Sequence, residues 1–309
     1  METFIQQIIN GLVLGSVYAL VALGYTMVYG ILELINFAHG EITMMGAMVA
    51  LAVIGALAVA APGLPGVLIL GAGLAVAIPA CMTLGLLIER VAYRPLRHAP
   101  RLAPLITAIG VSIILQNIAM LIWGKQYIPF PAILPEDRHT IYGASITDVQ
   151  IAILLLATSI MLMLILVVQK TRLGRAMRAT AQSRQVASLM GVDVNRVIAS
   201  TFVIGSALAA VAGVMVSVYY GLAHYYMGFL LGLKAFSAAV LGGIGNLGGA
   251  MLGGLLLGLI ESLGAGYIGD LTGGFLGSHY QDVFAFFVLI AVLVFRPQGL
   301  LGARVVERA

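Results

Sequence analysis

Long apolar runs separated by short polar stretches dominate this sequence. Most runs hold about twenty residues, enough for a helix rising about 1.5 Å per residue to cross a ~30 Å hydrocarbon core. Alternating segments of about ten residues, which a transmembrane β-barrel requires, are absent. The pattern predicts an all-α polytopic membrane protein with about eight to ten transmembrane helices. The apolar segments lie at about 5–30, 42–61, 67–88, 102–123, 148–168, 198–220, 233–260 and 282–295.

Composition supports the membrane class and adds a few exclusions. The chain is 61% hydrophobic and 9% charged, whereas about a quarter of the residues in a soluble domain are charged. Cys81 is the only cysteine, so an internal disulfide and a metal–thiolate site are excluded. Residues 1–7 lack the basic region of a cleavable signal, and we expect the first apolar segment to stay as an anchor. We expect residues 1–309 to form a single transmembrane domain.

Basic residues gather in clusters beside the apolar segments, as the positive-inside rule requires of cytoplasmic loops. The clusters place the loops 90–101 and 169–197 and the C-terminus inside, and they leave the loop 124–147 outside. The net charge of +4 therefore reports orientation, and it implies no nucleic-acid partner. The clusters comprise Arg90, Arg94, Arg97 and Arg101; Lys170, Arg172, Arg175, Arg178, Arg184 and Arg196; and Arg296, Arg304 and Arg308.

The last third of the chain raises a topology problem. With residue 221 outside and Arg296 inside, the stretch between them needs an odd number of crossings, yet only the apolar segments 233–260 and 282–295 lie there. A cluster of glycines at 242–249 interrupts the first of these segments. Each glycine inside a helix costs about 1 kcal/mol. We therefore expect the segment 233–260 to be broken rather than one simple helix.

A second interruption, near the start of the chain, has a similar glycine spacing. Segments 35–46 and 243–254 both place glycines six residues apart. Interrupted segments at corresponding places in two halves indicate a substrate path, and unwound backbone is tolerated where it lines a cavity. Chance in a glycine-rich chain gives the same pattern, and both interpretations stay open. The residues that would line such a path are Asn36, His39, Gly40, Glu41, Gly242, Gly243, Gly245 and Asn246.

Polar residues beside apolar segments also have a structural interpretation, because they can cap helices, pair with each other or lie at the membrane interface. That interpretation is favoured for Glu33, Glu89 and Asp282, whereas Asn36 and His39 fit either role. Enzyme motifs are missing: no Gly-x-x-x-x-Gly-Lys-Ser/Thr, His-Glu-x-x-His or Gly-x-Ser-x-Gly sequence occurs. We expect no catalytic residue, metal site or cofactor in this chain, and any ATP it uses must be hydrolysed by another chain.

The polar loop 169–197 is the strongest site signal. It carries six of the sixteen basic residues. We expect a short surface helix over Arg175–Met190 that docks into a cytoplasmic partner, with Gly174 and Gly191 marking its ends. The alternative is a solvated basic loop held to anionic lipid headgroups. On a helical projection Arg175, Arg178, Gln182 and Gln185 share one face, and Met177, Ala181 and Ser188 lie away from it.

This loop resembles the coupling loop of ABC importer permeases, whose Ala-x-x-x-Gly core corresponds to Ala187 to Gly191. The sequence Gly-Arg-Ala-x-Arg-Ala at 174–179 is similar to the branched-chain amino acid permeases, most closely the H-type subunits of leucine–isoleucine–valine systems. The resemblance spans roughly 10–300. Further similar stretches are Gly11–Leu20, Tyr29-Gly30, Ile35–Gly40, Glu89–Pro95, Lys234–Gly245 and Gly248–Ala250.

The resemblance implies an ABC importer permease fold in a bacterial inner membrane that works by alternating access. Its partners would be a related M-type permease, two cytoplasmic ATPases that bind the ATP, and a periplasmic binding protein that delivers a small-molecule substrate. Branched-chain amino acids are the implied cargo. Coupling to the ATPase would fall on Gly174, Arg175, Ala176, Arg178, Ala179, Ala187 and Gly191.

Other functions remain to be separated from this one. Permeases of urea or short amides are similar in sequence, and apolar small-residue walls suit any small neutral solute. A secondary transporter would keep ionisable residues in mid-helix for ion coupling, but most acidic residues here fall at segment ends. A membrane-embedded enzyme would need a convergent catalytic set, and none is visible.

Overall fold

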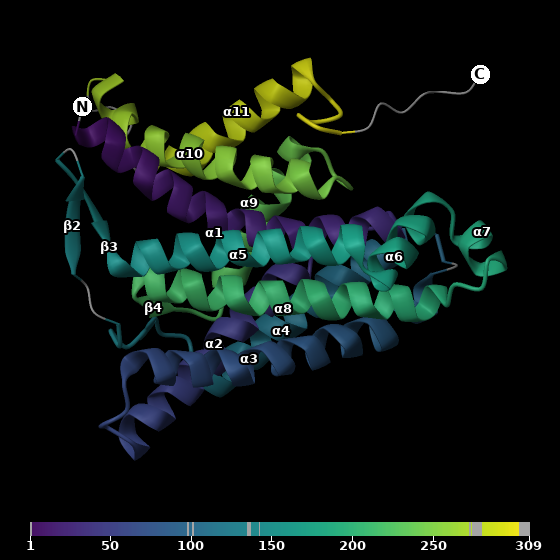
Figure 1. The fold of residues 1–309 in the computed structure, drawn as a ribbon, viewed down its shortest axis with the longest axis horizontal. Helices are drawn as coiled ribbons and strands as arrows, with labels where there is room; N and C mark the ends of the chain where they lie inside the picture. Colours follow the sequence, from purple (N-terminus) through teal and green to yellow (C-terminus); the bar gives the residue numbers. More distant parts are fainter. Residues whose placement is uncertain are drawn as a thin grey trace. The chain divides into compact units, whose positions relative to one another are not determined.

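The structure, a computed structural model, describes residues 2–302 apart from 98, 101, 135, 136, 142, 272 and 274–279. Among these residues, seven helices are long and apolar enough to cross a membrane, and two shorter apolar helices accompany them. The chain is therefore an all-α polytopic membrane protein, as its hydrophobic pattern predicts (Figure 1). The long helices are α1 (Glu2–Leu32), α2 (His39–Ala60), α3 (Gly66–Ile88), α4 (Leu102–Trp123), α5 (Asp148–Lys170), α8 (Val194–Tyr220) and α10 (Leu247–Leu271), and the shorter ones are α9 (Met227–Gly242) and α11 (Gln281–Phe295).

The apolar segment 233–260 is broken where its glycines predict. Helix α9 ends at Gly242, and α10 begins at Leu247. Among the described residues, the last third of the chain holds α9, α10 and α11; α10 is long enough to cross a membrane, and α9 and α11 are shorter apolar helices. Three crossings would satisfy the odd number that the charge pattern requires, and this count stays a prediction. Three of the residues used for that charge pattern, Arg101, Arg304 and Arg308, lie outside the described part of the chain.

Two compact units make up the chain. Unit 1 comprises Met1–Thr26, Glu136–Met161 and Lys234–Ala309, and unit 2 comprises Met27–Pro135 and Leu162–Leu233. Helices α1, α5 and α9 each contribute residues to both units. The expectation that residues 1–309 form one domain stays a prediction.

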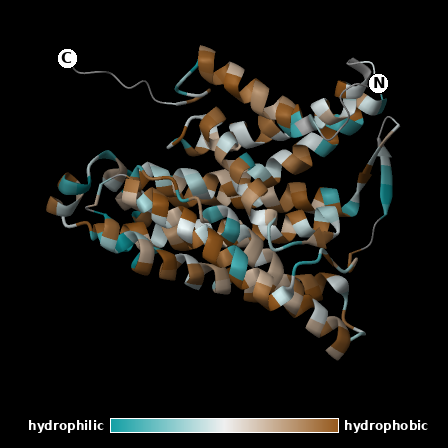
Figure 2. Ribbon diagram, turned by 180° about the vertical axis from the view of Figure 1, so that it is seen from behind, coloured by the Kyte–Doolittle hydropathy of each residue, from teal (hydrophilic) through white to brown (hydrophobic). Residues whose placement is uncertain are grey.

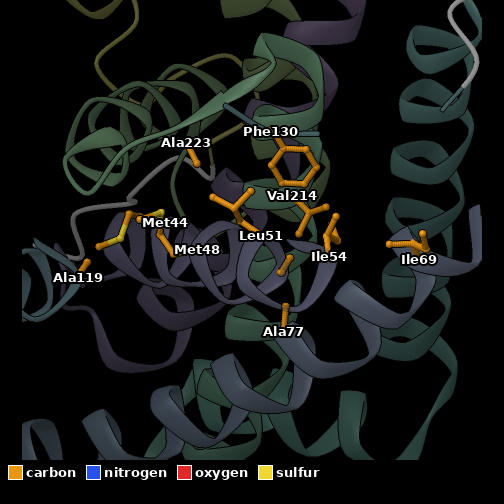
Figure 3. Packing of buried hydrophobic residues seen from close by; sticks show 11 residues of the cluster. Met44, Met48, Leu51, Ile54, Ile69, Ala77, Ala119, Phe130, Val214 and Ala223 are labelled. Carbon is orange, nitrogen blue, oxygen red and sulfur yellow. The ribbon is translucent and has the colours of Figure 1, made fainter. Parts of the chain in front are cut away.

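In unit 2, α2 forms the centre of the packing. Methionine and aliphatic side chains of α2, among them Met44, Met48 and Ile54, meet residues of α3 and α8 in one hydrophobic cluster (Figure 3). Small residues bring the backbones close: a Cβ on Gly46 would lie 2.6 Å from the Cα of Ala210 in α8. Close backbone approach is the usual basis of helix association in lipid, where the hydrophobic effect between helices is weak.

Unit 1 uses the same device between α1 and α10. A Cβ on Gly11 or Gly15 would lie 2.8 Å from a backbone Cα of α10, and a Cβ on Gly254 would lie 2.5 Å from Ala19. Gly11, Gly15 and Gly254 thus belong to a packing face between α1 and α10.

Hydrophobic residues occur along the length of the helices (Figure 2), and many of them are exposed. On α4, for example, Ile113, Ile114 and Leu121 are exposed. Contiguous apolar surface of this extent is abnormal for a soluble monomer and normal for a surface that faces lipid.

The loop 124–147 contains short strands that the sequence pattern did not reveal. Strand β1 (Ile128–Pro129) pairs antiparallel with β4 (Leu222–Ala223) in unit 2, and β2 (Arg138–Ile141) forms a hairpin with β3 (Ala144–Thr147) in unit 1. Strands this short hold few alternating positions, and periodicity over so few residues carries little signal.

Candidate functional site

The loop 169–197 folds into two short helices instead of the predicted single helix over 175–190. These are α6 (Arg172–Gln182) and α7 (Arg184–Leu189). Ser183 separates them: its backbone is extended, and its hydroxyl accepts a hydrogen bond from the Val186 N–H, which caps α7. Serine offers its side chain to the backbone in this way, which favours a helix start over a helix interior. The prediction was wrong here because it ignored the capping capacity of Ser183.

Gly174 does not mark a helix end as predicted. Helix α6 begins one turn earlier, where the Thr171 hydroxyl accepts a hydrogen bond from the Gly174 N–H at 3.1 Å. Gly174 is buried against the end of α5, and a Cβ there would overlap the carbonyls of Val167 and Val168. Glycine at this position therefore permits the sharp turn from α5 into α6.

Gly191 does mark a helix end. It follows α7 with φ +82, and no atom lies within 4 Å of where its Cβ would be. A left-handed glycine just past the last turn is a common helix stop, because glycine adopts this conformation without a steric penalty.

Two of the loop arginines bind backbone carbonyls at helix ends. Arg178 donates to the carbonyl of Val168 in α5, and Arg184 donates to the carbonyl of Ile31 in α1 at 2.9 Å. Carbonyls at a helix C-terminus carry partial negative charge, so a guanidinium stabilises them. These arginines tie α6 and α7 to the membrane helices of unit 2.

The predicted faces of the loop helix are partly right. Met177 is buried as an inward residue should be, whereas Ala181 and Ser188 are exposed. Ser188 follows the interruption at Ser183, which shifts the helical register, whereas Ala181 lies before it near the end of α6. Ala176 and Ala179 are half-buried. The predicted outward residues Arg175, Arg178, Gln182 and Gln185 are all exposed.

An exposed apolar tip at α7, formed by Val186, Leu189 and Met190, was missed from the sequence. Leu189 is 86% exposed and Met190 is 80% exposed. Ala187, on the other side of this helix, is buried. Large apolar side chains on an otherwise polar loop are typical of a docking surface. The position of these apolar residues just before the glycine that ends the helix was the sequence signal that could have revealed this surface.

The first chain interruption, between α1 and α2, is buried and polar. Glu33 ends α1 with φ 54, the left-handed region that non-glycine residues rarely adopt. Asn36 follows at 1% exposure. Its Oδ1 accepts hydrogen bonds from the Tyr93 hydroxyl at 2.9 Å and the Ala38 N–H at 3.2 Å, while its Nδ2 has no partner.

Helix α2 then begins at His39 without a side-chain cap. His39, Gly40 and Glu41 in its first turn are all buried. The Oε1 atom of Glu41 accepts hydrogen bonds from Ser112 at 3.1 Å and Gln116 at 2.7 Å, both on α4. The other carboxyl oxygen, Oε2, has no partner.

The first turns of α9 cover this helix start. A Cβ on Gly40 would overlap the backbone of Gly228 and Gly232. A Cβ on Gly228 would lie 2.6 Å from the Glu41 Oε2. These glycines bring α9 against the carboxyl group, and within unit 2 they close the site formed by Asn36 and Glu41.

The second interruption, Gly243–Asn246, has a different environment in unit 1. Gly245 and Asn246 are exposed. The chain after α11 reaches this turn, where the N–H groups of Leu300 and Leu301 donate to the carbonyls of Leu241 and Gly242, both at 2.9 Å. Asn246 also donates to the Leu301 carbonyl at 2.8 Å. Local partners satisfy this turn, and a role of Gly242, Gly243, Gly245 and Asn246 in a path stays a prediction.

A buried ion network lies elsewhere in unit 1. Lys234 on α9 lies 2.8 Å from the carboxylates of both Glu261 on α10 and Asp282 on α11. The Tyr18 hydroxyl on α1 donates to the other oxygen of Glu261 at 2.9 Å. Glu261 lies inside α10 and not at a segment end. The sequence argument against a secondary transporter, which relied on acidic residues lying at segment ends, is therefore weaker. Pairing between Asp282 and Lys234 agrees with the structural role favoured for Asp282.

A further polar cluster follows α3, where the helix changes to a π-helix at η1 (Glu89–Tyr93) and a 3₁₀ turn at η2 (Arg94–Leu96). Glu89 is buried and pairs with Arg97, which also donates to Asn195 at the start of α8. Burial lowers the pKa of Arg97, and the Glu89 carboxylate opposes that shift. The pairing agrees with the structural role that the sequence favoured for Glu89, so this cluster has a structural function.

Comparisons with known proteins identify the family of this chain. The family described as the permease component of branched-chain amino acid transport systems matches residues 7–293. The high-affinity branched-chain amino acid transport system permease protein BraD of Pseudomonas aeruginosa is 48% identical over 310 residues, which cover 99% of this chain and 98% of BraD. The corresponding LivH protein of Escherichia coli (strain K12) is 46% identical over 309 residues, covering 99% and 97%.

A more distant relative is a probable branched-chain amino acid transport permease protein LivH from Methanocaldococcus jannaschii, which is 28% identical over 305 residues.

The helical spans define a multi-pass membrane protein. With matches over nearly the whole chain, the protein belongs to the permease family of branched-chain amino acid transport systems.

Proposed function

We propose that this chain is the transmembrane permease subunit of an ATP-binding cassette importer that moves branched-chain amino acids across a bacterial inner membrane. The similarity to BraD and LivH over almost the entire length supports the substrate class. Within the structure, the observation that carries the proposal is the exposed apolar tip of α7. In this membrane protein a short loop helix is tied firmly to the membrane helices, yet its large apolar residues are left in water. Such a surface suits a soluble partner.

That partner is an ATPase, of which the importer holds two copies. Leu189 and Met190 insert into a groove of the ATPase, and Gly191 ends the helix tightly enough to transmit its movement. Arg175 is exposed and is available to pair with an acidic group there. Arg178 and Arg184, which hold helix-end carbonyls, transmit the movement into unit 2 instead.

The remaining partners are a related M-type permease and a periplasmic binding protein. ATP binding closes the ATPase dimer, the loop 169–197 moves with it, and the permease changes the side to which it opens. The ATPase chains bind the ATP, and the permease takes no cofactor of its own. The substrate passes the buried first interruption, where Asn36, His39, Gly40 and Glu41 meet.

Polar substitutions at the apolar tip test the coupling role. With the importer reconstituted in proteoliposomes, we expect Leu189→Ser with Met190→Ser to lower ATP-driven leucine uptake about tenfold or more, because a buried interface anchor contributes ~2 kcal/mol. Gly191→Leu should act in the same direction, because a side chain strains the left-handed position.

Leu64→Ser provides the matched control, since Leu64 is also exposed but lies in the turn between α2 and α3. It should leave uptake unchanged. Membrane insertion and detergent extraction should be equal for all variants. Full uptake by the Leu189/Met190 variant, or its normal co-purification with the ATPase, would contradict the assignment.

Substrate choice is tested with the unmodified importer. Uptake of labelled leucine, isoleucine, valine and urea is measured with and without the binding protein. We expect ATP-dependent uptake of the three amino acids and none of urea. Urea uptake without amino-acid uptake would place the chain with the short-amide permeases.

A further inference from the structure

Two buried side chains at the start of α2 each leave one polar atom unsatisfied. Asn36 and Glu41 are both 1% exposed. In each residue, one atom is held by two hydrogen bonds, so that the side chain has a fixed orientation. The second atom, Nδ2 of Asn36 or Oε2 of Glu41, has no hydrogen-bond partner among the residues that the structure describes. Buried polar groups are nearly always hydrogen-bonded, so two such exceptions at one helix start require an explanation.

Within the described residues, the Oε2 atom of Glu41 has neither a cation nor a hydrogen-bond donor as a partner. The ion pairs found in the described part of the chain do not include it. An isolated carboxylate inside a membrane protein is costly, so the group must either hold a proton or meet a positively charged ligand. Its fixed orientation, with Ser112 and Gln116 both on Oε1, leaves Oε2 for that role.

Asn36 supplies the complementary chemistry. Its Oδ1 accepts from Tyr93 and Ala38, so the free atom is the amide nitrogen, a hydrogen-bond donor. The uncapped N-terminus of α2 lies between the two residues in sequence and adds partial positive charge. The Asn36 amide and the N-terminus of α2 therefore suit an anion, whereas the Glu41 carboxyl suits a cation.

We propose that these two residues recognise the charged ends of an α-amino acid, with Glu41 Oε2 accepting from the ammonium group and Asn36 Nδ2 donating to the carboxylate. The proposal rests on the proposed importer function and adds the residues that select a zwitterion. Without substrate, a proton occupies Oε2, and it leaves to water when the ammonium group binds. Urea carries neither charge, so it offers no ammonium group to Glu41 Oε2 and no carboxylate to Asn36 Nδ2.

The structure shows this site in a closed state. The backbone of α9 at Gly228 lies against Glu41 Oε2, and Gly40 packs against the backbone of Gly228 and Gly232. Substrate enters when these first turns of α9 move away from α2. Glycine at these positions lets the two helices close without a side chain between them.

Equilibrium binding of tritiated L-leucine tests the proposal, with the whole importer in lipid nanodiscs and the binding protein omitted. Leucinamide, which lacks the carboxylate, and 4-methylpentanoate, which lacks the ammonium group, serve as competitors. We expect Glu41→Gln to weaken leucine binding about tenfold or more, because a charge-assisted hydrogen bond is lost while the shape is kept. The same variant should abolish the preference for leucine over 4-methylpentanoate.

Asn36→Asp keeps the oxygen that Tyr93 and Ala38 hold but removes the donor. It should weaken leucine binding while leaving leucinamide binding at the wild-type level. Glu33→Gln is the matched control, because it makes the same chemical change at an exposed residue, and it should bind leucine normally.

The outcomes separate this inference from the proposed function. If the wild-type importer takes up leucine with ATP but Glu41→Gln binds leucine as the wild type does, the recognition site is refuted and the importer function stands. ATP-driven leucine uptake without measurable leucine binding to the wild-type permease also refutes the site. If the wild-type importer neither binds nor transports leucine, the proposed substrate fails first and the site fails with it.

Discussion

Two glutamates buried to the same extent have opposite surroundings. Glu41 in unit 2 and Glu261 in unit 1 are each 1% exposed and lie within long apolar helices. Glu261 has a lysine on one oxygen and a tyrosine hydroxyl on the other. Glu41 has two neutral donors on one oxygen and, within the described part of the chain, no hydrogen-bond donor on the other.

This difference separates a stabilising network from a candidate binding site. A buried charge whose partners are complete holds helices together, and breaking it is costly. A buried carboxyl with an open position contributes less to the fold and keeps hydrogen-bonding capacity for a ligand. Burial and residue type alone cannot distinguish the two, since they are identical here.

The largest expected effect comes from removing the cation of the complete network. Lys234→Met leaves Glu261 buried without its counter-charge, and breaking a buried pair in this way costs about 3–5 kcal/mol. We expect a large loss of folded protein, measured as the monodisperse fraction after detergent extraction and as the midpoint of thermal unfolding.

Adding Glu261→Gln to Lys234→Met should restore part of the lost stability. The double variant leaves only Asp282, whose side chain is 36% exposed and reaches water. If Lys234→Met alone is as stable as the wild type, the network contributes nothing and the contrast with Glu41 disappears.

An intermediate effect is expected when one donor to Glu41 is removed. Gln116→Leu leaves Oε1 with Ser112 alone, and we expect a loss of about 1 kcal/mol, the typical net contribution of one hydrogen bond. Thermal unfolding of the purified protein measures the loss. Asn117→Leu is the neighbouring control, because Asn117 is exposed and bonds only a carbonyl of its own helix; equal losses in both variants would show that the Glu41 contact has no special role.

The smallest effect on stability is expected from Glu41→Gln. The amide is neutral, keeps an oxygen for Ser112 and Gln116, and removes no ion pair, so the free energy of unfolding should change by less than about 1 kcal/mol. The same substitution at Glu261 breaks the pair with Lys234 and should cost more. A reversed order, measured by thermal unfolding of both variants, would contradict the distinction between the two sites.

Much of the fold is readable from the sequence because a membrane imposes simple rules. Apolar length gives the spans, and the requirement for an odd number of crossings together with the glycines at 242–249 predicts the break between α9 and α10. The strands near residues 128 and 222 are not readable in this way, because their pairing joins residues far apart in the chain.

The candidate sites were less predictable. The loop 169–197 is conspicuous through its charge, but its division at Ser183 and the burial of Gly174 depend on local capping and on the end of α5. Asn36 and Glu41 could be named as polar residues at a glycine-rich interruption. Their open hydrogen-bonding positions could not, because these depend on Tyr93, Ser112 and Gln116 arriving from other helices.

By itself the sequence determined that this protein is a polytopic helical membrane protein of the branched-chain amino acid permease type, with a basic loop suited to docking. These properties follow from apolar length, charge position and local motifs, each read within a short stretch of chain. Only the tertiary structure decided which buried polar groups are satisfied. Hydrogen bonds and ion pairs require atoms within about 3 Å. Helix packing alone brings Lys234 to Glu261, while no cation among the described residues pairs with Glu41.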